Sequence, residues 1–256
     1  MPAHCLDILQ SAAGYRYSID SFILADFVSP AGEDKIVDFG TGNGVIPLLL
    51  SRKTKSKIVG LDIQNSLLRH AYCNIIQNGL ENQVTLIQGD IRCSKSFFKN
   101  GYFDIVVSNP PYRKLNSGRL NPNSEKAIAR HEILITLPEL VENAANLLRD
   151  EGKLVMIYLP ERYDELINTM VKNRLIPKKI RFIYSNKKND PKMFLAEGIK
   201  NVKGEQIVLN PLYIYDNNGN YTLEMQKIYD SFNNHCGTDN NREIRKSDPS
   251  GKAAAK

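Results

Sequence analysis

The stretch Asp38-Phe-Gly40-Thr-Gly42-Asn-Gly44 decides the fold of this chain. It continues the apolar run Lys35 to Phe39, which predicts a buried strand, and it precedes Val45 to Arg52, which predicts a helix. Glycines at such a junction let the chain turn tightly and let backbone N–H groups approach a ligand. A dinucleotide-binding turn has the spacing Gly-x-Gly-x-x-Gly. Here the third glycine comes one residue earlier, so the turn predicts a different ligand.

Strand and helix patterns alternate on both sides of this turn. Apolar runs predict further strands, and apolar residues at helical spacing predict helices between them. Thr136-Leu-Pro-Glu139 has the form of a capping box at a helix start. Strands are expected at 57–62, 83–88, 103–108, 153–158, 179–184 and 206–215, and helices at 21–28, 65–78, from 136 and 160–172. This order predicts an α/β fold: a mostly parallel, seven-stranded, Rossmann-like sheet with helices on both faces and the last strand antiparallel.

Two acidic residues follow the next two predicted strands. Asp62 ends the second strand, where a carboxylate can accept both ribose hydroxyls, and Asp90 follows the third, where it or its backbone can meet an adenine amino group. Ile63 and Ile91 would form apolar walls beside them. A single acid at a strand end is more often a turn or helix-cap residue. Three such features at successive strand ends, with the spacing Asp-x-Gly-x-Gly-x-Gly, are typical of S-adenosylmethionine sites, and the demethylated product would be S-adenosylhomocysteine.

The fourth predicted strand runs into Ser108-Asn109-Pro110-Pro111-Tyr112. Two prolines fix φ and remove two backbone donors, so the Asn109 side chain and the Pro110 carbonyl present acceptors in a stiff turn. Acceptors for both N–H bonds of an aromatic amine would direct its lone pair toward a methyl donor. Tyr112 could stack on the base. The alternative is an ordinary β-turn, since Asn-Pro is a common turn dipeptide.

Positive charge is concentrated in two segments. The whole chain of 256 residues carries a net charge of +6, and residues 178–203 alone account for that excess. A second basic segment, 111–130, includes Arg113 and Lys114. Such clusters favour a phosphate-rich partner, against the alternative of a solvated lysine-rich surface. We expect RNA contacts from the first segment at Lys187, Lys188 and Lys192.

Composition narrows the remaining choices. A hydrophobic content of 42% is sufficient for the core of one sizeable domain. No apolar run of about 18 residues or signal peptide is present, so we expect no membrane association and a cytoplasmic location. The four cysteines are scattered without Cys-x-x-Cys spacing, so we expect no metal site. No obligate protein partner is expected.

These motifs resemble the Asn-Pro-Pro-Tyr class of amino-methyltransferases, and within it the bacterial tRNA1(Val) adenine-37 N6-methyltransferase family. Four further stretches carry the resemblance: Gly14-Tyr-Arg-Tyr-Ser-Ile-Asp20, Ile128-Ala-Arg-His-Glu132, Ala196-Glu-Gly-Ile-Lys200 and Asn210-Pro-Leu-Tyr-Ile-Tyr-Asp216. The resemblance implies tRNA as partner and adenine N6 as target. It also implies cofactor contacts from Tyr17, Ser18 and Asp20, although Ser18 and Asp20 fit helix capping equally well. Arg130, His131 and Lys200 become candidates for RNA contact.

Two other functions remain open at this point. A protein-glutamine methyltransferase acting on a release factor would use the same turn on another planar amide, but only about 34 residues precede the first strand, too few for the helical domain usual there. A non-catalytic RNA-binding scaffold is the second alternative. We expect residues 1–34 to cover the cofactor, 35–230 to form the methyltransferase domain, and 231–256 to be a disordered tail.

Overall fold

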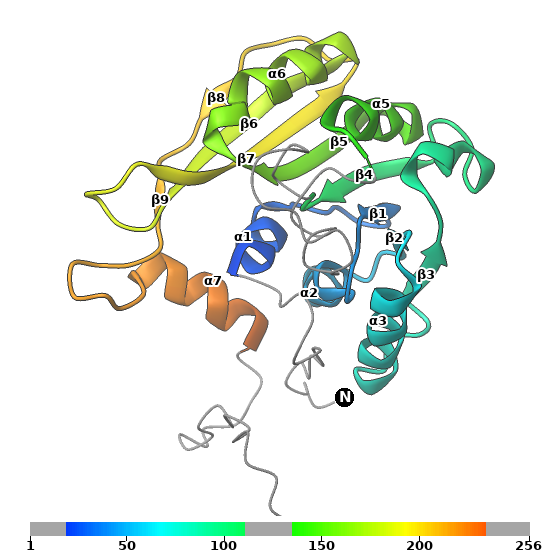
Figure 1. Ribbon diagram of the computed structural model, residues 1–256, viewed down its shortest axis with the longest axis horizontal. Helices are drawn as coiled ribbons and strands as arrows, with labels where there is room; N and C mark the ends of the chain where they lie inside the picture. Colours follow the sequence, from blue (N-terminus) through cyan, green and yellow to red (C-terminus); the bar gives the residue numbers. More distant parts are fainter. Residues whose placement is uncertain (1–18, 111–134, 234–256) are drawn as a thin grey trace, which may run out of the picture.

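The computed structural model describes residues 19–110 and 135–233, which form a nine-stranded sheet between two layers of helices (Figure 1). The strand order is β3-β2-β1-β4-β5-β7-β6-β8, and β9 also pairs with β6. The strands are β1 Ile36–Phe39, β2 Ile58–Asp62, β3 Val84–Gln88, β4 Phe103–Ser108, β5 Leu148–Tyr158, β6 Leu175–Tyr184, β7 Pro191–Lys200, β8 Ile207–Val208 and β9 Leu212–Tyr213. Strands β1 to β5 are parallel, and β7 runs antiparallel between β5 and β6.

Each face of the sheet buries its own apolar core. The first core lies under α1 Ile19–Phe27, α2 Val45–Lys53, α3 Asn65–Gln77 and α7 Leu223–Asn233. The second lies under η1 Ile91–Ser96, α5 Leu137–Leu147, η2 Pro160–Arg162 and α6 Tyr163–Lys172. The central strands are buried on both faces, as expected where helices cover a parallel sheet. The Rossmann-like α/β prediction is confirmed.

The predicted basic loop is largely a β-hairpin. Strands β6 and β7 pair antiparallel across residues 175–200, and a turn at 185–190 joins them. The antiparallel strand is therefore β7, and the strand expected over 206–215 consists of the two short strands β8 and β9. Hydrophobic alternation did not reveal β7, because its buried centre includes Glu197 and Gly198, residues that are depleted in strands. Pairing with Lys179 across the hairpin stabilises Glu197, at an Nζ–Oε1 distance of 3.0 Å.

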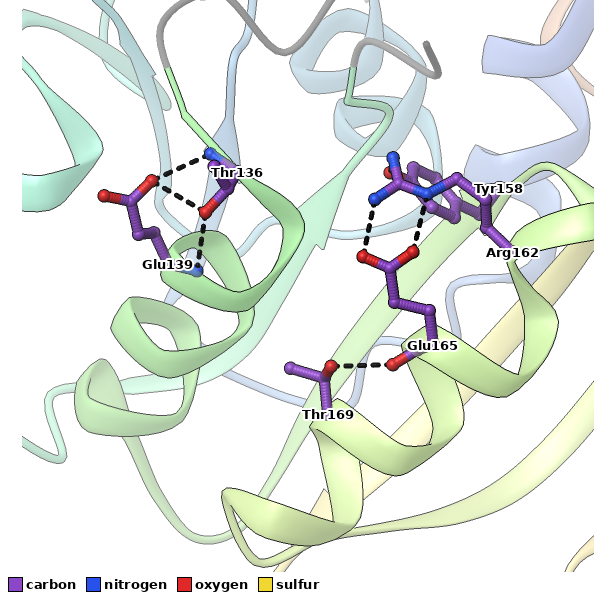
Figure 2. A network of polar contacts seen from close by, with 6 residues as sticks. All are labelled: Thr136, Glu139, Tyr158, Arg162, Glu165 and Thr169. Atoms are coloured by element: carbon purple, nitrogen blue, oxygen red, sulfur yellow. Dashed lines mark hydrogen bonds and ion pairs between the residues drawn. The ribbon is translucent and has the colours of Figure 1, made fainter. Parts of the chain in front are cut away.

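The polar contacts that fix the start of α5 and of α6 are drawn in Figure 2. The capping box predicted at Thr136 is confirmed: its hydroxyl accepts from the Glu139 N–H at 3.4 Å, and the Glu139 carboxylate accepts from the Thr136 N–H at 2.9 Å. Buried Arg162 donates to both Glu165 carboxylate oxygens and to the Tyr158 hydroxyl at the end of β5. These contacts place both helices firmly against the same face of the sheet.

Helices α1 and α7 lie at the expected boundaries between the central domain and the two terminal segments. Helix α1 packs on α2 and α7, and the Lys53 ammonium donates to three carbonyls at the end of α1, those of residues 25, 26 and 28. Helix α7 continues to Asn233, beyond the expected domain end at 230, because Phe232 is buried in the first core. The rest of the expected tail and the first 18 residues lie outside the described part.

Candidate functional site

The glycine turn connects the carboxyl end of β1 to α2. Gly40, Gly42 and Gly44 have φ of +75°, +54° and +76°, a left-handed conformation that favours glycine. The Gly40 and Thr41 N–H groups both donate to the Leu61 carbonyl, which ties the turn to β2. A Cβ at Gly40 or Gly42 would meet no atom within 4 Å, whereas one at Gly44 would lie 3.0 Å from the Ala71 Cβ. The first two glycines therefore face open space, and the third allows α2 and α3 to approach each other.

Asp62 supports the turn from the end of β2. Its two carboxylate oxygens accept from the backbone N–H of Gly42 and of Gln64, each at 2.8 Å. The side chain is almost completely buried, and burial raises the pKa of Asp62 while these backbone hydrogen bonds oppose the rise. Each oxygen retains a second lone pair, so hydroxyl groups of a ligand can still donate to it.

Asp38 is the unusual acid of the site. It is completely buried in β1, and within the described residues neither carboxylate oxygen accepts a hydrogen bond. Burial raises the pKa of Asp38 to about 7; the nearby Thr41 hydroxyl opposes the rise without reaching hydrogen-bond geometry, and the charge of Asp62 adds to it. An unpartnered buried carboxyl beside an open glycine turn fits a ligand that carries positive charge.

The end of β4 meets the glycine turn directly. In the parallel register Ser108 is the partner of Phe39, and the Ser108 hydroxyl donates to the Phe39 carbonyl at 2.9 Å. The next residues of the two strands, Asn109 and Gly40, therefore leave the sheet side by side. Asn109 is partly exposed and Pro110 is buried. This juxtaposition matches the expectation that the Asn-Pro turn and the glycine turn share one site.

The third strand end is arranged differently from the other two. Asp90 caps η1 by accepting from the Arg92 N–H at 2.9 Å, and both its oxygens bind the Arg92 guanidinium, which lowers the pKa of the Asp90 carboxyl. The helix-cap alternative therefore describes its side chain, and an adenine contact stays a prediction for its backbone. Ile63 is 37% exposed beside Asp62, as an apolar wall requires, whereas Ile91 belongs mainly to the second core.

One supporting residue was missed from the sequence. Asn74 is completely buried on α3, and its amide donates to the Asn43 carbonyl at 3.0 Å, which holds the glycine turn from the helix side. A polar residue on the otherwise apolar face formed by Leu68, Ala71 and Ile75 was the signal that could have revealed it.

The expected RNA-contacting lysines separate into two groups. Lys187 and Lys188 are exposed in the β6–β7 turn and Lys192 is exposed at the start of β7. Because Phe194 is paired with Tyr158 at the carboxyl end of β5, this turn extends beyond the same sheet edge as Asn109. Lys200 lies at the opposite edge, and its ammonium donates to the Ala145 and Leu148 carbonyls at 2.7 and 2.6 Å. We therefore correct the prediction that Lys200 contacts RNA: it caps the end of α5.

The remaining predicted residues lie at the start of α1 or outside the described part of the chain. Asp20 lies buried in the first turn of α1. Outside the described residues lie Tyr17, Ser18, Pro111, Tyr112, Arg113, Lys114, Arg130 and His131. Among residues 19–110 and 135–233, none of the helices has the length and hydrophobicity of a membrane-spanning segment. In the same residues, no three His, Cys, Asp or Glu side chains gather as metal ligands would.

Comparisons with known proteins identify relatives of this chain. Among curated proteins, the chain is 29% identical to a tRNA1(Val) (adenine(37)-N6)-methyltransferase of Porphyromonas gingivalis over 75% of its own length and 77% of the relative's. It is 27% identical to the protein of that name from Parabacteroides distasonis, over 71% and 76% of the two chains.

Solved structures share the fold. A predicted O-methyltransferase from Agrobacterium tumefaciens superposes with a TM-score of 0.68 at 16% identity, covering 83% of this chain and 96% of the other. A geranyl diphosphate C-methyltransferase from Streptomyces coelicolor superposes with a TM-score of 0.54 at 15% identity, over 71% and 76% of the two chains. A family described as a methyltransferase domain matches residues 31–207, more than half of the sequence. The chain therefore belongs to the methyltransferase domain family.

Proposed function

We propose that this protein transfers a methyl group from S-adenosylmethionine to the 6-amino nitrogen of adenine in tRNA, at position 37 of a valine tRNA. The observation that carries the proposal is the register of β1 and β4, by which the Asn-Pro turn at Asn109 and Pro110 starts beside the glycine turn. The names of the curated relatives supply the tRNA position. The proposal places the enzyme in the cytoplasm, where tRNA is found, and requires no protein partner.

The residues at the glycine turn fit this cofactor. Asp62 would accept the ribose hydroxyls with its remaining lone pairs, and the open backbone at Gly40 and Gly42 would lie against the methionine part. The buried, unpartnered Asp38 carboxyl favours a cation over the turn. Bound S-adenosylmethionine supplies a methyl group that its positive sulfur has already activated, so the protein needs no strong base.

The Asn-Pro turn at Asn109 and Pro110 would position and polarise the 6-amino group of the target adenine. An adenine amino nitrogen is a poor nucleophile because its lone pair is delocalised into the ring. Acceptance of its two N–H bonds by Asn109 Oδ1 and the Pro110 carbonyl draws the nitrogen toward tetrahedral geometry and frees the lone pair. Neither acceptor takes a full proton at neutral pH, so the proton lost on N–C bond formation passes to water. Tyr112 would stack on the base, and Arg113, Lys114, Arg130 and His131 would contact the RNA.

Nucleoside mass spectrometry tests this function against the two alternatives. Purified protein is incubated with isotopically labelled S-adenosylmethionine and either total tRNA or a release factor. We expect labelled N6-methyladenosine in the tRNA digest and no label on the release factor. Label on a release-factor glutamine would instead support the glutamine methyltransferase. Binding of tRNA with no transfer to either substrate would support the scaffold.

Substituting Lys187, Lys188 and Lys192 by alanine together should weaken tRNA binding and flatten its salt dependence. Each phosphate contact contributes about 0.7 to 0.9 to the slope of log K against log salt, so the slope should fall by about 2 to 3. Filter binding over a range of salt concentrations measures it. The matched control removes Lys55, Lys99 and Lys172, exposed lysines that precede strands and so lie at the opposite sheet edge. Equal slopes in both triple variants would exclude the hairpin as an RNA contact.

Cofactor affinity should depend on pH through Asp38. Because its pKa is about 7 without ligand, a bound cation must favour the ionised form, and binding releases a proton below pH 7. Affinity for S-adenosylmethionine should therefore fall as the pH drops below 7, by up to about tenfold per unit. Calorimetry in two buffers of different ionisation enthalpy measures the released proton.

The Asp38→Asn variant is the control, since it cannot titrate and should bind with little pH dependence. The unliganded protein should show the opposite trend in stability. An acid with a raised folded-state pKa favours the folded state when it is protonated, so the contribution of Asp38 to the unfolding free energy, measured as the difference between wild type and Asp38→Asn, should decrease from about pH 4 to about pH 7 and then level off. A wild-type affinity that stays constant from pH 6 to 8 would contradict this role for Asp38.

A further inference from the structure

The β6–β7 turn with Lys187, Lys188 and the adjoining Lys192 is called the lysine hairpin. Beside it lies a row of tyrosines that the proposed site does not use. Tyr215 and Tyr221 are stacked, with ring centroids 5.5 Å apart and an interplanar angle of 19°. Tyr221 is 6.2 Å from Tyr229 on α7, and Tyr229 is 5.2 Å from Phe22 on α1. The three tyrosines are 39%, 37% and 38% exposed. The segment after β9 and helix α7 therefore present three aromatic rings to solvent, and buried Phe22 on α1 supports the last of them.

The row is continuous with the lysine hairpin. The Tyr215 N–H donates to the Ser185 carbonyl at 2.8 Å, at the point where β6 enters the hairpin turn. Just before it, Tyr213 packs on Tyr184 with centroids 5.4 Å apart, and the Lys187 ammonium lies 5.9 Å above the Tyr213 ring. The hairpin lysine Lys187 thus lies against the aromatic rings that continue into the tyrosine row.

The other end of the row reaches the first turn of α1. Helix α1 is followed by Ser29, whose carbonyl accepts from Lys153 at 3.5 Å, at the amino edge of the parallel strands. Phe22, in the first turn of α1, lies at the other end of this helix and contacts Tyr229. The row runs from the hairpin to this turn. In Figure 1, α7 and α1 lie next to each other on the side of the sheet where β9 ends.

We propose that the tyrosine row is a stacking platform for unpaired RNA bases next to the target adenine. Single-stranded nucleic acid binds where aromatic side chains stack on bases and basic side chains follow the phosphates, and this surface combines both. The inference rests on the proposed tRNA methyltransferase function and specifies how loop bases are held.

Leucine substitution at Tyr215 and Tyr221 tests the platform. Two RNAs serve as probes: an anticodon stem–loop with an unpaired adenine and a fully paired duplex of equal length. Each substitution should weaken stem–loop binding by about tenfold, because it removes a base–aromatic stack, and should leave duplex binding unchanged. The salt slope should also stay unchanged, since no charge is lost. Tyr221→Phe keeps the ring and should bind as wild type.

The matched control is Tyr72→Leu. Tyr72 is 60% exposed on α3, which packs against β3 at the opposite end of the strand order. This variant should bind both RNAs normally. If Tyr215→Leu and Tyr221→Leu bind the stem–loop as well as Tyr72→Leu does, the tyrosine row is not a stacking platform. If wild-type protein methylates tRNA but the leucine variants bind normally, only the platform fails. If wild type neither binds nor methylates tRNA, the proposed function fails as well.

A crosslinking measurement on the unmutated protein covers the case in which a variant does not fold. The stem–loop is prepared with 5-bromouridine beside the target adenine, irradiated in complex with the full chain, and the adducts are mapped by peptide mass spectrometry. We expect adducts on Tyr215, Tyr221 or Tyr229. Adducts confined to other surfaces would contradict the inference.

Discussion

Asn109→Ala should slow methyl transfer by about two to three orders of magnitude and leave cofactor binding intact. The substitution removes an acceptor that the target amine needs in the transition state, and loss of one such positioned partner lowers kcat by about 10²- to 10³-fold. Asn109 follows Ser108, whose hydrogen bond to Phe39 does not depend on the Asn109 side chain, so the glycine turn should keep its shape. Single-turnover transfer to tRNA and calorimetric titration with S-adenosylhomocysteine measure the two effects.

The control for Asn109 is Asn100→Ala, an exposed asparagine in the loop that leads into β4 at the opposite edge of the sheet. It should transfer methyl groups at the wild-type rate. If Asn109→Ala retained most of its transfer rate, the Asn-Pro turn would be an ordinary turn, the alternative that its dipeptide composition allows. If it lost cofactor affinity to the same extent as activity, the division of roles between the two turns would be wrong.

Asp62→Ala should have the converse effect and weaken cofactor binding by about 100-fold or more. The variant loses the acceptor for the ribose hydroxyls and leaves the Gly42 and Gln64 N–H groups unpaired, which costs about 1 to 3 kcal/mol of stability. Both consequences follow from one carboxylate because Asp62 holds the glycine turn and, in the proposed site, would also bind the ribose. Titration calorimetry gives the affinity, and denaturant unfolding gives the stability.

Asp104→Ala separates these two consequences. Asp104 also accepts from a backbone N–H, that of Lys35 at 2.8 Å, and it pairs with Arg149, but it lies at the amino edge of β4. Its loss should lower the unfolding free energy and spare cofactor affinity. An Asp62→Ala variant that binds the cofactor as well as Asp104→Ala does would show that Asp62 only supports the turn.

Local sequence was sufficient to predict the elements that build the site. Strand β4 and the capping box at Thr136 were predicted at the observed residues, because apolar runs and capping residues act over a few positions. The meeting of Asn109 with the glycine turn also followed, since parallel strands separated by helices bring their carboxyl ends to one edge.

What the sequence did not reveal depends on contacts between distant residues. Lys200 lies in a basic segment, which predicted an RNA contact, yet its ammonium binds backbone carbonyls 52 and 55 positions earlier in the chain. Strand β7 was hidden because Glu197 becomes tolerable in a buried strand only through Lys179 on the neighbouring strand. The three tyrosines lie within residues 215–229, but their spacing of six and eight residues fits no regular element, so only the fold shows that their rings form one row.

A crystal structure of the full chain with S-adenosylhomocysteine and an adenosine-containing stem–loop would show whether the Asn109 turn and the glycine turn form one site. We expect the cofactor sulfur between the glycine turn and Asn109, and the adenine 6-amino group within hydrogen-bond reach of Asn109 Oδ1 and the Pro110 carbonyl. A cofactor bound over the glycine turn with the adenine amine turned away from Asn109 would contradict this expectation.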